Sequence, residues 1–168
     1  MKIADFGVAW ADTNNGIEPR GKMKFEVGTR HYRAPELIFS AGDYTNAIDL
    51  WSIGCIFAEF FTRPSGSPLF NGESDIEQLA KIFQVLGVPT EETWPEMKNF
   101  PDYGKLNFKI KECLGLTKQQ LPEANSPDII QFISKFLEYG FEERMTANQA
   151  LQDSIFDSSD FLKTRVEL

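Results

Sequence analysis

The hydrophobic and polar positions divide the chain into helical segments separated by polar, turn-rich stretches. Residues 46–62 are apolar on nearly every side of a helix, and Thr45, just before them, is a good N-cap residue. A helix without a polar face belongs in the interior of a domain. The pattern therefore predicts one buried helix over residues 46–62 at the centre of the fold.

Three further segments begin or end with helix signals. Residues 74–87 start with the capping box Ser-Asp-Ile-Glu, carry apolar side chains at helical spacing and stop at Gly87. Residues 126–140 open with Ser-Pro and close with Gly140, and residues 146–152 open with a second capping box. Together these signals predict a mainly α domain.

The remaining stretches are expected to be irregular. Residues 11–24 are polar and rich in turn formers, which predicts a mobile loop. Residues 89–111 mix Pro, Gly and Asn with scattered aromatics. Strand is predicted only at residues 2–4 and, briefly, at residues 8–10.

Composition narrows the classes of function. With 42% hydrophobic and 13% aromatic residues, the 168-residue chain suits one globular unit. Its formal net charge of -8 argues against nucleic-acid binding. Cys55 and Cys113 lack the spacing of a metal site or a disulfide framework, which indicates a reducing compartment. The apolar run 50–61 is too short to span a bilayer, so we expect a nuclear or cytoplasmic protein that does not act on membranes.

Three motifs follow one another along the chain. Asp5-Phe6-Gly7 comes first, residues 28–36 read Gly-Thr-Arg-His-Tyr-Arg-Ala-Pro-Glu, and residues 49–54 read Asp-Leu-Trp-Ser-Ile-Gly. Each motif alone is a weak signal, but in this order they resemble the C-terminal lobe of eukaryotic Ser/Thr protein kinases. The Tyr-Arg-Ala-Pro-Glu form and the run over residues 68–90 are similar to the cyclin-dependent-kinase-like (CMGC) group.

This resemblance implies a fold and a set of boundaries. The chain would be a helical kinase C-terminal lobe built around one buried central helix, with the β-rich N-terminal lobe absent. Residues 1–156 would form a partial protein kinase domain. Within it, residues 5–36 match the activation segment and residues 37–156 the helical lobe, while residues 157–168 would be a C-terminal tail.

The resemblance also implies the cofactors ATP and Mg²⁺. Asp5 matches the Asp that holds Mg²⁺ against the ATP phosphates, and a carboxylate is the hard oxygen ligand that Mg²⁺ prefers. Phe6 and Gly7 complete the cofactor-binding motif, in which Gly7 gives the backbone freedom that lets Phe6 pack in or out.

The second motif implies the acceptor side of the reaction. Thr29 matches the Thr that bonds to the catalytic-loop Asp near the acceptor hydroxyl, and so would organise the acceptor site. Tyr32 and Arg33 would shape the substrate pocket. Arg33 resembles the residue that is associated with targets in which proline follows the acceptor, although kinases that activate other kinases also carry it.

Three charged residues match structural positions of the family. Glu36 matches a Glu that pairs with a buried Arg late in the domain, and Arg144 stands where that Arg is expected. Asp49 matches the Asp at the start of the central helix, which accepts backbone N–H bonds from the catalytic loop. A plain helix-dipole role is the alternative for Asp49.

The activation segment departs from the common pattern. Many cyclin-dependent kinases are phosphorylated on a Thr five residues before the position of Thr29, where this chain has Lys24, which cannot carry that phosphate. Thr13 is the only hydroxyl in the loop over residues 11–24, and His31 replaces a common Trp. The departure is similar to the fungal single-subunit kinases that activate cyclin-dependent kinases, so a kinase acting on other cyclin-dependent kinases is one interpretation. A degenerate loop in a non-functional copy is another.

The chain contains no G-x-G-x-x-G loop, no Val-Ala-Ile-Lys strand and no His-Arg-Asp loop. Phosphoryl transfer depends on positioning and charge stabilisation by those parts. We therefore expect a fragment, inactive alone, of a kinase that moves the γ-phosphoryl of ATP to protein Ser/Thr in cell-cycle or transcription control. The alternatives are a catalytically dead lobe that docks protein partners and a gene remnant. A cyclin is a further candidate partner of the complete kinase.

Overall fold

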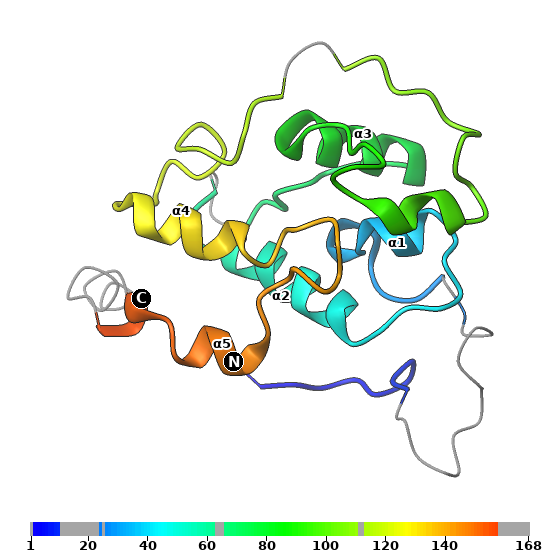
Figure 1. Ribbon diagram of the computed structural model, residues 1–168. Coiled ribbons are helices and arrows are strands. Elements are labelled where there is room, and N and C mark those ends of the chain that lie inside the picture. Colours follow the sequence, from blue (N-terminus) through cyan, green and yellow to red (C-terminus); the bar gives the residue numbers. More distant parts are fainter. Residues whose placement is uncertain (1, 11–23, 25, 63–65, 111–112, 158–168) are drawn as a thin grey trace.

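The computed structural model describes residues 2–10, 24, 26–62, 66–110 and 113–157. Its α-helices are α1 (Pro35–Ile38), α2 (Ala47–Glu59), α3 (Asp75–Leu86), α4 (Pro127–Ser134) and α5 (Ala147–Leu151) (Figure 1). Three 3-10 helices join them: η1 (Arg30–Tyr32), η2 (Pro95–Asn99) and η3 (Ser154–Asp157). These residues contain no β-strand, so the helical character predicted from the sequence is confirmed.

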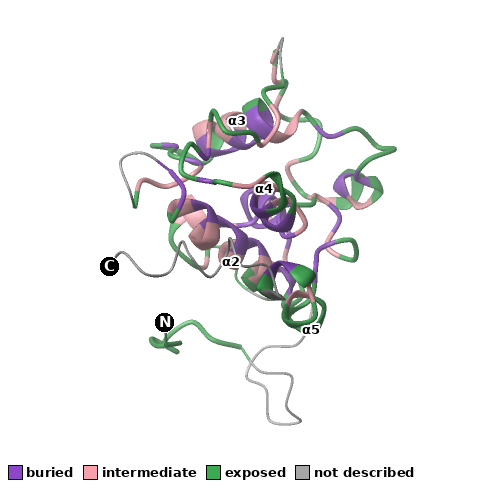
Figure 2. Ribbon diagram, turned by 90° about the vertical axis from the view of Figure 1, so that its left-hand side faces the viewer, coloured by how far each residue is buried: buried purple, intermediate pink, exposed green. Residues whose placement is uncertain are grey.

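Helix α2 forms the centre of the fold, in contact with η1 and α4 (Figure 2). Trp51, Cys55 and Ala58 are buried along it. Gly54 permits close packing, because a Cβ there would lie 2.6 Å from the Cβ of Phe136. The predicted central helix is confirmed, but its burial is not complete. Phe60, directly after it, is 60% exposed, and several other apolar side chains on α2 are only half-buried.

The capping signals correctly located the starts of three helices. The hydroxyl of Ser74 accepts the N–H of Glu77 at the start of α3, and that of Ser126 accepts the N–H of Asp128 at the start of α4. Thr146 forms a complete capping box with Gln149 at the start of α5. Gly87 ends α3 with a φ of 91°, a conformation that favours glycine.

Two other expectations are wrong. Helix α4 ends at Ser134 rather than continuing to Gly140. Residues 2–4 and 8–10 are irregular rather than strand, and residues 2–10 are exposed along the outside of the helical body (Figures 1 and 2). Most of the loop predicted at residues 11–24, with Thr13, and nearly all of the tail at residues 157–168 lie outside the described residues.

A cluster of aromatic side chains closes the core beside α3. Trp94 is fully buried and packs against the rings of Phe39, Phe100 and Tyr139. The phenol of Tyr139 donates a hydrogen bond of 2.5 Å to the carbonyl of Gly87, at the end of α3. This cluster holds α1 and α3 together and so fixes the surface on which η1 lies. None of the described helices has the length and apolar character needed to cross a bilayer.

Candidate functional site

The motif Asp5-Phe6-Gly7 lies in an exposed segment of the chain, residues 2–10. Asp5 adopts a φ of 61°, its Oδ1 lies 3.3 Å from the backbone nitrogen of Gly7, and the side chain of Phe6 is 71% exposed. Within the part of the chain that the structure describes, no three His, Cys, Asp or Glu side chains cluster as a metal site. Magnesium commonly takes one or two protein carboxylates together with phosphate oxygens and water. Asp5 therefore fits as one ligand of such an ion but does not make a site alone.

The backbone before η1 has an unusual conformation that is held by an arginine. Gly28 has a φ of 74°, in the left-handed region that glycine adopts without strain. Its carbonyl accepts a 3.1 Å hydrogen bond from Nη2 of Arg33. Thr29 follows with an extended backbone and an exposed side chain. The carbonyl of Gly28 is thus directed at this chain's own arginine instead of at an external N–H donor.

Tyr32 anchors η1 on the central helix. Its hydroxyl donates a 2.7 Å hydrogen bond to Oε1 of Glu59, and its carbonyl accepts one of 2.8 Å from Oγ of Ser52. The hydrogen bond to the Glu59 carboxylate, with partial burial, raises the pKa of Tyr32 to about 12. Tyr32 therefore attaches η1 to α2, while Arg33 holds the carbonyl of Gly28, which precedes η1 in the chain.

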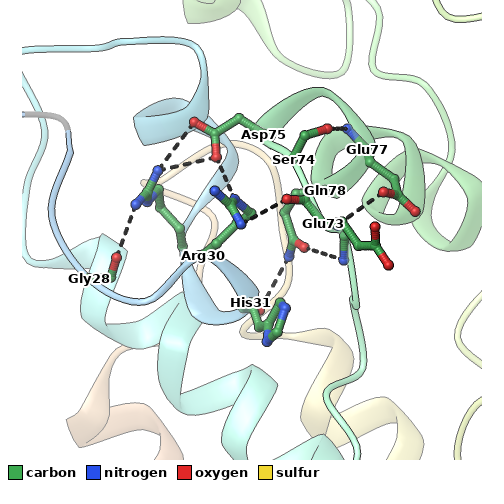
Figure 3. Close-up of polar contacts among 10 residues, drawn as sticks. Gly28, Arg30, His31, Glu73, Ser74, Asp75, Glu77 and Gln78 are labelled. Atoms are coloured by element: carbon green, nitrogen blue, oxygen red, sulfur yellow. Dashed lines mark hydrogen bonds and ion pairs between the residues drawn. The ribbon is translucent and has the colours of Figure 1, made fainter.

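The first turn of α3 holds η1 from the other side (Figure 3). Asp75 is 2.9 Å from Nε of Arg30 and 3.4 Å from Nη1 of Arg33. Gln78, one turn further along α3, is fully buried and donates a 3.3 Å hydrogen bond to the carbonyl of His31. Its Oε1 accepts the N–H of Gly72 at 2.9 Å.

Asp75 and Gln78 were not identified as site residues from the sequence, because their partners lie more than forty positions earlier in the chain. The polar side chain of Gln78, in the apolar stripe of an amphipathic helix, was the one signal that could have marked Gln78 as a site residue.

Glu36 and Arg144 form a buried ion pair. Nη1 and Nη2 of Arg144 lie 2.6 Å and 2.8 Å from the two carboxylate oxygens of Glu36. Arg144 also donates to the carbonyls of Glu138, Ala47 and Tyr139, and its guanidinium lies 5.1 Å from the ring centroid of Trp51. The pair connects α1, directly after η1, to the start of α2 and to the loop before α5.

Asp49 lies on the first turn of α2 with its side chain at the surface. Desolvation by the surrounding protein still raises the pKa of its carboxyl. Neither Thr29 nor Asp49 is buried, so water can satisfy both side chains in this structure.

A known protein family accounts for most of the chain. The family model described as "Protein kinase domain" matches residues 1–156. The chain therefore belongs to the protein kinase family, and the resemblance that its motifs indicated is confirmed.

The chain is similar to cyclin-dependent kinases of an animal and a plant. Cyclin-dependent kinase 20 of Danio rerio is 42% identical over 156 residues, which cover 93% of this chain and 43% of that protein. Cyclin-dependent kinase D-1 of Arabidopsis thaliana is 39% identical over 159 residues, which cover 95% of this chain and 37% of that protein.

A solved structure agrees with the fold. One chain in the crystal structure of the yeast RNA Pol II CTD kinase CTDK-1 complex superposes with a TM-score of 0.75 at 25% identity, over 86% of this chain and 47% of that one. The chain thus spans less than half the length of the curated relatives that it matches.

Proposed function

We propose that this chain supplies the acceptor side of a protein Ser/Thr kinase of the cyclin-dependent type. In this proposal the described helices are the C-terminal lobe, and η1 with its flanking residues receives the protein substrate. The observation that carries it is the contact between Arg33 and the carbonyl of Gly28. This contact gives a backbone arrangement that selects among substrates.

The preference among substrates follows from which backbone groups already have a hydrogen-bond partner. The carbonyl of Gly28 is already paired with Arg33, so it is a poor acceptor for the N–H of a substrate residue laid beside it. An unpaired N–H is costly when it is desolvated, but proline has no N–H to leave unpaired. The complete kinase is therefore expected to prefer Ser or Thr followed by proline.

Each predicted site residue has its own role in the proposed reaction. Asp5 would hold Mg²⁺, with Phe6 and Gly7 on the cofactor side, and ATP with Mg²⁺ would supply the phosphoryl group and neutralise its charge. Thr29 would organise the acceptor hydroxyl, and Tyr32 would keep Thr29 and Arg33 in register through its bond to Glu59. The Glu36–Arg144 pair and Asp49 would support the lobe.

The chain alone is not expected to transfer phosphate, since it contains no Gly-rich loop, no Val-Ala-Ile-Lys strand and no His-Arg-Asp loop. Candidate partners of the complete kinase are protein substrates, other cyclin-dependent kinases and a cyclin. Lys24 stands at the common phosphorylation position, which supports activation without phosphate there.

A catalytically dead lobe that docks proteins is the second candidate. The 60% exposed Phe60 and the half-buried apolar side chains of α2 support it, because exposed apolar surface promotes association.

The test uses the product of the complete coding sequence that contains this chain. Phosphate transfer from ATP would be measured on two peptides that differ only in having Pro or Ala after the acceptor Ser, with Asp5→Asn as the inactive control. Transfer that favours the Pro peptide and is lost in Asp5→Asn supports the proposal. Wild-type transfer no greater than that of Asp5→Asn, with and without an added cyclin, overturns it in favour of the dead lobe.

A further inference from the structure

One carboxylate on α3 is shared by two arginines that flank Tyr32. Oδ1 of Asp75 lies 2.9 Å from Nε of Arg30, and Nη1 of Arg33 lies 3.4 Å from each of the Asp75 carboxylate oxygens (Figure 3). Arg30 also donates a 3.0 Å hydrogen bond to the carbonyl of Glu73. Asp75 therefore connects both ends of η1 to the start of α3.

The two arginines differ in how far they depend on this carboxylate. The side chain of Arg30 is 40% exposed, so water hydrates much of its charge. That of Arg33 is 13% exposed, and its Nε is buried without a hydrogen-bond partner among the described residues. A largely desolvated guanidinium with an unpaired N–H needs nearby negative charge to remain in place. Asp75 supplies that charge.

Arg33 in turn links Asp75 to the substrate side. Its Nη1 faces Asp75, while its Nη2 donates to the carbonyl of Gly28. If the carboxylate were removed, the guanidinium could turn toward solvent and release that carbonyl. Gln78 holds only the middle of η1, through the carbonyl of His31, and cannot replace Asp75 at the arginine.

We propose that Asp75 is a positioning residue that sets substrate selection by holding Arg33 on the carbonyl of Gly28, with Arg30 as the second anchor. The inference rests on the proposed kinase function and assigns its selectivity to a residue of α3 outside the substrate segment. Asp75 touches neither substrate nor nucleotide in this account; it acts through Arg33.

Glu77 offers a matched control on the same turn of α3. Its side chain is 42% exposed against 48% for Asp75, and Oε2 of Glu77 accepts the backbone N–H of Glu73. Glu77→Gln removes the same unit of charge and keeps an acceptor for that N–H. Asp75→Asn and Glu77→Gln therefore change the net charge equally but differ in their effect on Arg33.

The test compares these variants with wild type and with Asp75→Glu in the product of the complete coding sequence. The measured quantity is the ratio of kcat/KM for the Pro peptide to that for the Ala peptide. We expect the ratio to fall about fivefold in Asp75→Asn, to stay at the wild-type value in Glu77→Gln, and to be largely restored in Asp75→Glu. The KM for ATP should be the same in all four proteins.

An unchanged ratio in Asp75→Asn overturns the inference, as does an equal loss of activity on both peptides. If the wild type transfers no phosphate, the proposed function has failed, and amide hydrogen exchange of residues 28–33 decides the positioning role separately. Faster exchange in Asp75→Asn than in Glu77→Gln supports it, and equal exchange overturns it.

Discussion

Nη1 of Arg144 lies 2.6 Å from Oε1 of Glu36, across 108 positions of the chain. Both side chains are almost fully buried, so their charges have lost most of their hydration. Each guanidinium nitrogen has an acceptor: the two carboxylate oxygens of Glu36 and the carbonyls of Ala47, Glu138 and Tyr139. A buried pair of this kind is tolerated because its donors are satisfied.

Breaking this pair should be far more costly than breaking an exposed one. Arg144→Met leaves the Glu36 carboxylate buried and unpaired, which we expect to lower the free energy of unfolding by about 3–5 kcal/mol. Lys135→Met removes the pair between Lys135 and Asp153, whose lysine is 43% exposed, and should cost less than about 1 kcal/mol. Urea unfolding of both variants checks the difference. Similar losses would contradict the role assigned to the buried pair.

Local chemistry explains what the sequence could predict of the fold. The caps at Ser74, Ser126 and Thr146 depend on side chains within three residues of the bonds they make, so their motifs were sufficient. The end of α4 could not be read in this way. Phe136 and Leu137 continue the apolar pattern and are buried, but the carbonyl of Lys135 accepts the N–H of Met145 at 2.8 Å. That distant bond takes the acceptor that a continuing helix would use.

The residues of the candidate site also differ in whether a local motif could predict them. Motif matching named Thr29, Tyr32, Arg33, Glu36 and Arg144, because each occupies a fixed place in a recognisable string. The clamp formed by Asp75 and Gln78 depends on α3 lying against η1, and no local pattern carries that contact. Asp5 belongs to the first motif, and its role stays a prediction.

Gly72 is expected to be required by the clamp. A Cβ at this position would lie 2.3 Å from the backbone nitrogen of Gln78, too close for either backbone to remain in place. We expect Gly72→Ala to cost about 1–3 kcal/mol through overpacking and to displace Gln78 from the carbonyl of His31. Thermal unfolding measures the first effect, and hydrogen exchange in η1 measures the second.

Gly66→Ala is the matched control for this substitution. Gly66 has a φ of 83°, but the space that a Cβ would occupy there is open, so alanine should cost about 1–2 kcal/mol from backbone strain alone. It should leave exchange in η1 unchanged. Faster exchange in Gly66→Ala, or wild-type exchange in Gly72→Ala, would show that the close approach to Gln78 does not matter.

Because of Tyr32, the free energy of unfolding should fall as the pH becomes alkaline. The hydrogen bond to Glu59 raises the pKa of the phenol to about 12, above its ordinary value of 10.0, because the bond requires the protonated hydroxyl. The stabilisation is therefore fully present below about pH 10 and is lost as the pH rises toward about 12. Between about pH 9 and about pH 11, wild type should lose more unfolding free energy than Tyr32→Phe does. Parallel pH profiles of the two proteins in urea unfolding would rule out this linkage.

The two cysteines should differ sharply in reactivity. Cys55 is 1% exposed, and burial raises the pKa of its thiol, so very little reactive thiolate forms there. Cys113 is exposed, with its Sγ 3.1 Å from the carbonyl of Val85. A maleimide should therefore add once to the native chain, at Cys113, and a second time only after unfolding in urea. Mass spectrometry distinguishes the adducts, and Cys113→Ser should remain unmodified in the native state. Rapid native labelling of Cys55 would mean that α2 is not packed at the centre of the fold, because no reagent reaches that thiol while Trp51 and Ala58 stay buried beside it.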